Sequence, residues 1–317
     1  MISVKNIFSR FRGASLILII ILFSIAMSFC SPYFLTWDNI KTTVISMCCD
    51  GIVTIGMTIV LISGGIDLSV GAVLGLSGVV TGVLYNNGTN IFLAGIIAVL
   101  ICIIIGVLNG LISCKTSIAP MITTLGTMNV ARGMALTFTQ GSPQSIKNMP
   151  EAFRFLGKGQ LFGIPFIIVL FLFCVIILSF LLRKSVMMRK IFYVGSNARS
   201  AEFSGINVAH VKMGVYILSA FLAALAGILT ASRFAVATPT AGTGSEMTAI
   251  SAAVIGGASL SGGEGSIIGA VLGLLLLTLI NNALVLLNVS VYWQQFISGG
   301  ILLIAVLTDY YINRKKI

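Results

Sequence analysis

Long uncharged apolar runs are the feature that most restricts what this chain can fold into. The segments 91–113 and 162–182 contain no acidic or basic side chain. A helix needs about 20 such residues to cross roughly 30 Å of hydrocarbon. Inside lipid, backbone N–H and C=O groups must be satisfied within the protein, and a helix satisfies them within one segment. The sequence therefore predicts an all-α fold, a polytopic transmembrane helical bundle.

Cutting the apolar runs at proline, glycine, asparagine and charged residues gives about ten spans, all within a single domain that covers 1–317. The predicted spans are 14–34, 43–63, 67–85, 91–113, 119–139, 162–182, 212–232, 246–261, 266–288 and 292–311. Glycines interrupt the second, third, eighth and ninth of these, so broken or re-entrant helices are the alternative there.

Composition and charge agree with a membrane protein. Hydrophobic residues make up 57% of the chain and charged residues 9%, whereas about a quarter of a soluble domain is charged. The net charge of +11 falls in short segments between apolar runs, so it indicates topology and no nucleic-acid partner. Because Lys and Arg accumulate on the cytoplasmic side, both termini, Lys115 and the segment 183–212 are predicted to be cytoplasmic.

Motifs for catalysis, metals and cofactors are missing from the sequence. There is no phosphate-binding loop, no H-E-x-x-H and no G-x-S-x-G, and the chain has one histidine. The six cysteines lie in or beside apolar runs without a metal-ligand spacing, which predicts reduced core residues. We therefore expect no catalytic residue, no metal and no cofactor on this chain.

Two acidic residues lie in or beside the apolar runs. Asp67, in the stretch GGIDLSVGAVLG at 64–75, either caps free N–H groups at the start of the third span or acts as a gating or ion-coupling residue. A cap contributes about 1 kcal/mol, whereas an acid at the bilayer centre costs about 2.5 to 3.5 kcal/mol, which favours the cap. Asp50 in the second span either reaches the outer surface or lines a solute path.

Polar side chains in two other spans have two interpretations each. They are Thr124, Thr127 and Asn129 in the fifth span, beside Thr123 and Arg132, and Asn281 and Asn282 in the ninth. Such groups form hydrogen bonds between helices or contact a solute. Hydrogen bonding between helices is the simpler role for most of them.

The segment from Arg183 to Lys212 contains a predicted short helix over 198–203. Ser196 or Asn197 is placed to cap its first turn, and Gly205 to end it. The helix is either a solvated element lying against anionic headgroups, or a docking element that presents Phe203 and Ile206 to an apolar groove of a cytoplasmic partner.

Two stretches of the sequence are similar to each other. GGIDLS at 64–69 is followed by GAVLGL at 71–76, and GGASLS at 256–261 is followed by GAVLGL at 269–274. Duplicated halves occur in transporters, although sequence rich in Gly, Ala and Leu also produces such matches by chance. Both explanations stay open at the level of sequence.

Several ordered blocks resemble one known family. GGIDLSVGAVLGL at 64–76, VGSNARSAEFSGINVAHVK at 194–212 and AAVIGGASLSGGEGSIIGAVLG at 252–273 are similar to the membrane-spanning permease subunit of ribose-type sugar ABC importers. TLGTMNVARGMAL at 124–136 and YWQQFISGGILLIAV at 292–306 resemble the same family. The resemblance implies a multi-pass protein of the bacterial inner (plasma) membrane that moves a small polar solute, such as ribose or a related sugar, and has no enzymatic activity of its own.

The resemblance also implies partners and roles. The partners are a second permease in a homodimer or heterodimer, cytoplasmic ATPase subunits that hydrolyse ATP, an extracytoplasmic solute-binding protein, and membrane lipid. The implied coupling element contacts the ATPase through Asn197, Arg199, Glu202, Phe203, Ser204, Gly205 and Ile206. The candidates for the translocation path or gate are Asp50, Asp67, Thr124, Thr127, Asn129, Asn281 and Asn282.

Three alternatives remain at this point. One is an ion-coupled secondary transporter that uses Asp67 or Asp50, and another is a channel. The third is an ABC permease of the same superfamily for an autoinducer-type furanone, a nucleoside or a branched-chain amino acid. A secondary transporter or channel needs no docking helix, so the segment 194–212 discriminates between these classes.

Overall fold

The chain folds almost entirely into helices, as the sequence predicts. The computed structural model describes residues 4–116 and 118–314. Its larger helices are α1 (Val4–Cys30), α2 (Trp37–Ile62), α3 (Val70–Asn86), α4 (Ile91–Lys115), α5 (Pro120–Thr139), α7 (Phe166–Lys184), α10 (Val208–Phe234), α11 (Ser245–Ile255), α12 (Ile267–Leu286) and α13 (Val291–Arg314). The shorter helices are α6 (Glu151–Lys158), α8 (Val186–Ser196) and α9 (Ala198–Phe203).

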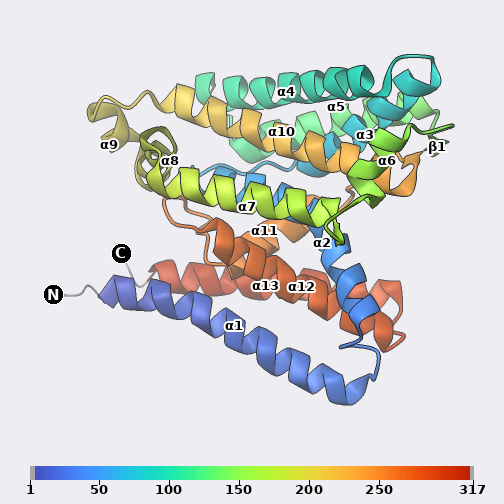
Figure 1. Ribbon diagram of the computed structural model, residues 1–317. Coiled ribbons are helices and arrows are strands. Elements are labelled where there is room, and N and C mark those ends of the chain that lie inside the picture. Colours follow the sequence, from blue (N-terminus) through green and yellow to red (C-terminus); the bar gives the residue numbers. More distant parts are fainter. Residues whose placement is uncertain (1–3, 117, 315–317) are drawn as a thin grey trace.

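The long helices run side by side along one axis of the bundle (Figure 1). One end carries α8 and α9, together with the start of α1 and the end of α13 (Figure 1). The other end carries α6 and two small antiparallel sheets, in which β1 (Gln144–Ser145) pairs with β4 (Val236–Ala237) and β2 (Gln160–Leu161) pairs with β3 (Ile164–Pro165). This arrangement places 183–212 at the same end of the bundle as the start of α1 and the end of α13. That this end faces the cytoplasm stays a prediction.

Five helices in the described part of the chain are long and apolar enough to cross a membrane. They are α2, α4, α7, α10 and α12. Shorter apolar helices cover 14–30, 70–86, 245–255 and 291–307. Among the five, α2 is the most buried and α7 the most exposed, so α2 lies in the interior of the bundle and α7 on its surface.

The predicted span 246–261 is wrong in its length. α11 contains 11 residues and ends at Ile255, where Gly256 and then Gly257, with a φ of 94°, stop the helix. At 1.5 Å per residue it covers about 16 Å, roughly half of the hydrocarbon core. The third span also starts later than predicted, because 63–69 is irregular and α3 begins at Val70. The chain thus reverses through two loops, 63–69 and 256–266.

The core is centred on α10, which packs against α2, α3 and α4. Tyr216 and Leu222 of α10 are fully buried. Gly106 and Gly110 of α4 allow close approach, because a Cβ atom on Gly106 would lie 2.8 Å from the carbonyl oxygen of Tyr216. Small residues four apart on a helix permit such close packing within a membrane. All six cysteines are free.

Candidate functional site

The short helix α9 has the boundaries and caps that the sequence predicts. The side chain of Asn197 accepts a hydrogen bond from the backbone N–H of Ser200 at 3.0 Å. At the other end, the N–H of Gly205 bonds to the carbonyl of Glu202, and the N–H of Ile206 to that of Ala201. This is a Schellman ending, and it requires the positive φ of Gly205, which is 77°. Six residues are thereby fixed as a helix by local contacts.

The side chains of α9 divide between the bundle and the solvent. Ala201 is buried and Ile206 is half-buried, so these two hold the helix against the protein. The ring of Phe203 is 93% exposed, and Arg199 and Glu202 are also exposed. On α9, Phe203 alone is a large exposed apolar group, whereas the sequence predicted that Ile206 would be exposed beside it.

Three backbone segments meet directly before α9, at Ile62, at Gly195–Ser196 and at Gly263, and we call this contact the junction. The N–H of Gly263 donates to the carbonyl oxygen of Ile62 at 2.8 Å. A Cβ atom on Gly195 would collide with that same oxygen and lie 2.6 Å from the nitrogen of Gly263. A Cβ atom on Gly263 would in turn lie 2.8 Å from the Cα of Ser196. The end of α8 therefore contacts both chain-reversal loops, without side chains between them.

Asp67 is buried at the start of α3 and acts as a hydrogen-bond acceptor for two elements. Its Oδ1 accepts from the backbone N–H of Ser69 at 3.0 Å and from the Ser69 hydroxyl at 2.6 Å. Its Oδ2 accepts from the hydroxyl of Ser219 on α10 at 2.9 Å. The predicted helix cap is wrong in its detail, because Ser69 is the N-cap residue of α3 and no side chain caps its first turn. Asp67 instead closes a turn two residues before the helix and ties the loop 63–69 to α10.

Hydrogen bonds extend from this carboxylate to α4 and α5. Asn109 donates its side-chain amide to the Ser69 hydroxyl at 3.0 Å, and Thr127 donates to the Asn109 carbonyl oxygen at 2.6 Å. Thr124 accepts from the backbone N–H of Leu68 at 3.1 Å. The structure thus brings Asp67, Thr124 and Thr127 together, although the sequence placed them in different spans. Asn109 and Ser219 were not anticipated.

The remaining path candidates lie apart from this cluster. Asp50 accepts a hydrogen bond from the Ser245 hydroxyl at 2.8 Å, and it is about 20 Å along α2 from Trp37. Asn282 exchanges two amide hydrogen bonds with Asn39, at 2.9 and 2.8 Å, and so links α12 to α2. Asn281 is exposed.

Asn129 is exposed on α5, between Gly126 and Gly133 on the same helix. A Cβ atom on either glycine would meet no atom within 4 Å. Because helical positions 126, 129 and 133 lie on one side, they form an exposed strip of small residues with a single amide. Leu125 and Val130 beside this strip are exposed as well.

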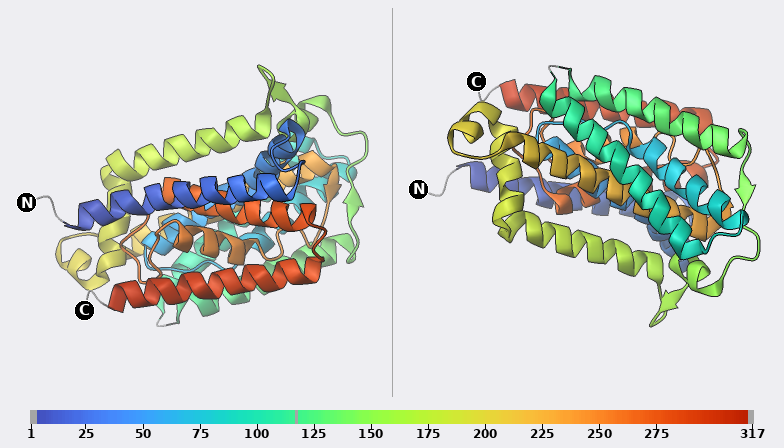
Figure 2. Two further views of the ribbon diagram at one scale, coloured as in Figure 1. Left: turned by 90° about the horizontal axis from the view of Figure 1, so that it is seen from below. Right: turned by 90° about the horizontal axis from the view of Figure 1, so that it is seen from above.

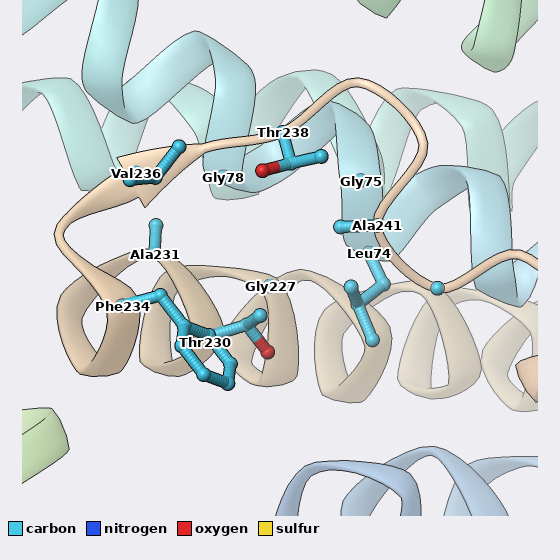
Figure 3. Close-up of a pocket in the computed structure, with 11 residues that line it drawn as sticks. Leu74, Gly75, Gly78, Gly227, Thr230, Ala231, Phe234, Val236, Thr238 and Ala241 are labelled. Atoms are coloured by element: carbon cyan, nitrogen blue, oxygen red, sulfur yellow. The ribbon is translucent and has the colours of Figure 1, made fainter. Parts of the chain in front are cut away.

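A strap formed by 235–244 covers α3 near the end of the bundle that carries α6. Arg132 of α5 donates to the carbonyl oxygens of Pro239 and Ala241, the second at 2.9 Å. A cavity of about 260 Å³ lies between the strap, α3 and α10. Thr238 lies on one side of this cavity and Thr230 and Phe234 on the other (Figure 3). The hydrogen bonds of Arg132 hold the strap against α5, and their acceptors in the strap were not predictable from the sequence.

Within the described residues, no three His, Cys, Asp or Glu side chains are grouped in a way that could hold a metal ion.

Comparison with known proteins gives a consistent family. Residues 39–306 match the model of the family described as branched-chain amino acid transport system / permease component. The ribose import permease protein RbsC of Bacillus subtilis (strain 168) is 40% identical over 292 residues, which cover 92% of this chain and 89% of that protein. The ribose import permease protein RbsC of Haemophilus influenzae is 37% identical over 305 residues, which cover 96% of this chain and 94% of that protein. The L-arabinose transport system permease protein AraH of Escherichia coli (strain K12) is 36% identical over 292 residues, with 92% and 88% covered. No solved structure matches the chain.

Proposed function

Because this chain belongs to the family of branched-chain amino acid transport system permease components, we propose that it is the membrane-spanning permease of an ABC importer for a monosaccharide such as ribose. The named relatives support a monosaccharide as the transported solute, since they are permeases for ribose or L-arabinose and their alignments cover about nine tenths of this chain. In this role the chain catalyses no reaction. It works with ATPase subunits and a solute-binding protein, in a cell membrane.

The exposed ring of Phe203 is the observation that supports coupling to an ATPase. A six-residue helix capped at both ends projects from the bundle and leaves an aromatic side chain 93% exposed. Aromatic anchors of this kind dominate the binding energy of protein interfaces when they fill a pocket. We assign the docking contact to Phe203, with Arg199, Glu202 and Ser204 at its rim and with Asn197, Gly205 and Ile206 holding the helix in place.

The path is assigned to the exposed strip of α5. Asn129 between Gly126 and Gly133 supplies an amide for sugar hydroxyls and leaves room for a second permease copy, homologous or identical, to approach. Asp67, Thr124, Thr127 and Asn282 are assigned structural roles, since each bonds another part of the same chain. An ion-coupled role of Asp67 is disfavoured, because two serines already bind its carboxylate.

The test is copurification of the cognate ATPase with tagged permease in nanodiscs, followed by ATPase and sugar-uptake measurements. Phe203→Ala is expected to weaken ATPase binding at least tenfold, equivalent to about 1.4 kcal/mol, and to abolish uptake. Glu202→Ala, one residue away on the same helix and also exposed, is the matched control with a mild effect, since surface charges contribute a few tenths of a kcal/mol.

Size-exclusion chromatography establishes that both variants are folded, and Phe203 makes this a fair comparison because its ring packs against almost nothing in the chain. A folded Phe203→Ala protein with full ATPase binding and full uptake would show that α9 is a surface element. The ion-coupled secondary transporter would then be the better hypothesis.

A further inference from the structure

The hairpin before α7 ends in an exposed apolar tip. In the hairpin, Gln160 is opposite Pro165 and Leu161 is opposite Ile164, so Phe162 and Gly163 form the turn. Phe162 is 96% exposed, the largest exposed fraction among the large apolar side chains of the described residues. Leu161 and Ile164 beside it are exposed as well.

The backbone of the turn gives no reason for a phenylalanine. The φ angle is 52° at Phe162 and 82° at Gly163. Two-residue hairpin turns with positive φ at both positions favour Asn-Gly or Gly-Gly, and a bulky side chain with positive φ is a conformational outlier. Because the ring neither packs within the chain nor suits the turn, a contact outside the chain explains it.

The base of the hairpin is fixed, so the tip cannot be regarded as a loose loop. The N–H of Phe166 donates to the carbonyl of Gly159 at 2.9 Å, and the rings of Phe155 and Phe166 are 5.1 Å apart. Phe153 of α6 is buried in the bundle. The hairpin projects sideways beyond the end of α7, on the side of the bundle away from α5 (Figure 2).

The surroundings of the tip indicate lipid. α7, which starts one residue after the hairpin, exposes Phe173, Ile176 and Phe180 along its length, as a helix does that borders lipid. Lys158 and Arg154 are exposed on α6 next to the hairpin, whereas Glu151 lies in the opposite, first turn of that helix. Aromatic rings and long cationic side chains are the groups that membrane–water interfaces favour.

We propose that the tip formed by Leu161, Phe162 and Ile164 inserts into the headgroup boundary of the leaflet at the end of the bundle opposite α9, with Lys158 and Arg154 bound to lipid phosphates. The hairpin thereby fixes the depth and tilt of α7 in the membrane. This surface is separate from the strip of α5 and from α9.

A fluorescence experiment in nanodiscs tests the insertion. Phe162→Trp is placed in a Trp37→Phe, Trp293→Phe background, since these are the chain's two tryptophans. Ser142→Trp, in the exposed loop after α5, and Phe173→Trp, in the exposed face of α7, are the aqueous and lipid controls. Phe162→Trp is expected to emit at shorter wavelength than Ser142→Trp and to be quenched at least twofold more by lipid brominated near the headgroup than by lipid brominated at the acyl end. Phe173→Trp is expected to show the reverse order.

Two results would overturn the proposal. One is emission and quenching of Phe162→Trp equal to those of Ser142→Trp. The other is a response to added solute-binding protein but not to brominated lipid, which would assign the tip to a protein partner. Leu161→Trp, on the same hairpin, serves as a second reporter if Phe162→Trp does not elute as a folded protein.

Discussion

Two substitutions of the buried Asp67 separate the effect of its hydrogen bonds from the effect of its charge. Asp67→Asn keeps an oxygen that accepts from the N–H and hydroxyl of Ser69, and its new amide donates to the hydroxyl oxygen of Ser219, which accepts as well as donates. All three contacts survive with weaker, uncharged bonds. We expect a loss of about 1 kcal/mol, the difference between charged and neutral hydrogen bonds.

Asp67→Leu leaves the same donors without an acceptor. The two hydroxyls can rotate toward other oxygens, but the Ser69 N–H cannot, and a buried unsatisfied donor costs about 1–3 kcal/mol. With partial loss at the hydroxyls, the total is about 2–5 kcal/mol. The Leu variant should therefore unfold at lower temperature than the Asn variant, and it should lose the connection through Ser69 to Asn109 and α5.

The assay combines thermal unfolding of purified protein in detergent with sugar uptake in reconstituted vesicles that contain the ATPase and binding protein. The unfolding temperature and the rate of sugar uptake are both expected to decrease in the order wild type, Asp67→Asn, Asp67→Leu. Asp67→Asn should retain measurable uptake. If Asn matches wild type in stability but has no uptake, the negative charge itself is required, and the assignment of Asp67 as a structural residue is refuted.

Two further predictions concern the junction and the topology. Gly195→Ala should abolish uptake while ATPase binding persists, because the added Cβ collides with the Ile62 carbonyl oxygen. The control is Gly214→Ala, whose added Cβ meets no atom within 4 Å. Equal sugar uptake by the two variants would contradict a role for the junction. In a cysteine-free background, cysteines at Ser196 and Asn87, both exposed, should label from opposite sides with an impermeant thiol reagent, and labelling of both from outside would exclude the predicted orientation.

The sequence was sufficient for α9 because its determinants are local. An Asn cap, six helix residues and a Gly two positions after the last one satisfy the orphan backbone groups at both ends. Nothing outside 197–206 is needed to fix those boundaries. The same is true of the long apolar helices, whose existence follows from the absence of water in the bilayer.

Apolar composition alone could not give the length of α11. Residues 246–261 are apolar enough for a span, but Gly256 and Gly257 end the helix after 11 residues. The small elements at the opposite end, β1 to β3 and α6, were missed for a related reason. The partner of β1 lies far away in the sequence, with Ala237 opposite Gln144. β2 and β3 are neighbours in the sequence, but two-residue strands have no periodicity to detect.

The hydrogen-bond partners of Asp67 could not be predicted from the sequence either. The cap interpretation follows from its position before an apolar helix, but Asp67 bonds the N-cap residue Ser69 and no N–H group inside α3. Ser219 and Asn109 reach the loop from α10 and α4, which only the packing of the bundle brings together. The sequence therefore singled out Asp67, but neither its burial nor the hydrogen-bond network to which it belongs could be predicted.

The junction relates the two similar sequence blocks to α9. GGIDLS follows α2 and precedes α3, whereas GGASLS follows α11 and precedes α12, so the two blocks occupy equivalent places at helix reversals. Both loops meet the end of α8 through backbone atoms.

A displacement of α9 by an ATPase would reach these two loops without a flexible side chain to absorb it, because close-packed backbone transmits strain. From 256–266 the displacement continues into α12. From 63–69 it continues into α3 and, through Ser69, Asn109 and Thr127, into α5. Under the proposed function α5 carries the path, and the contact at Gly195 would then connect α9 to the exposed strip of α5.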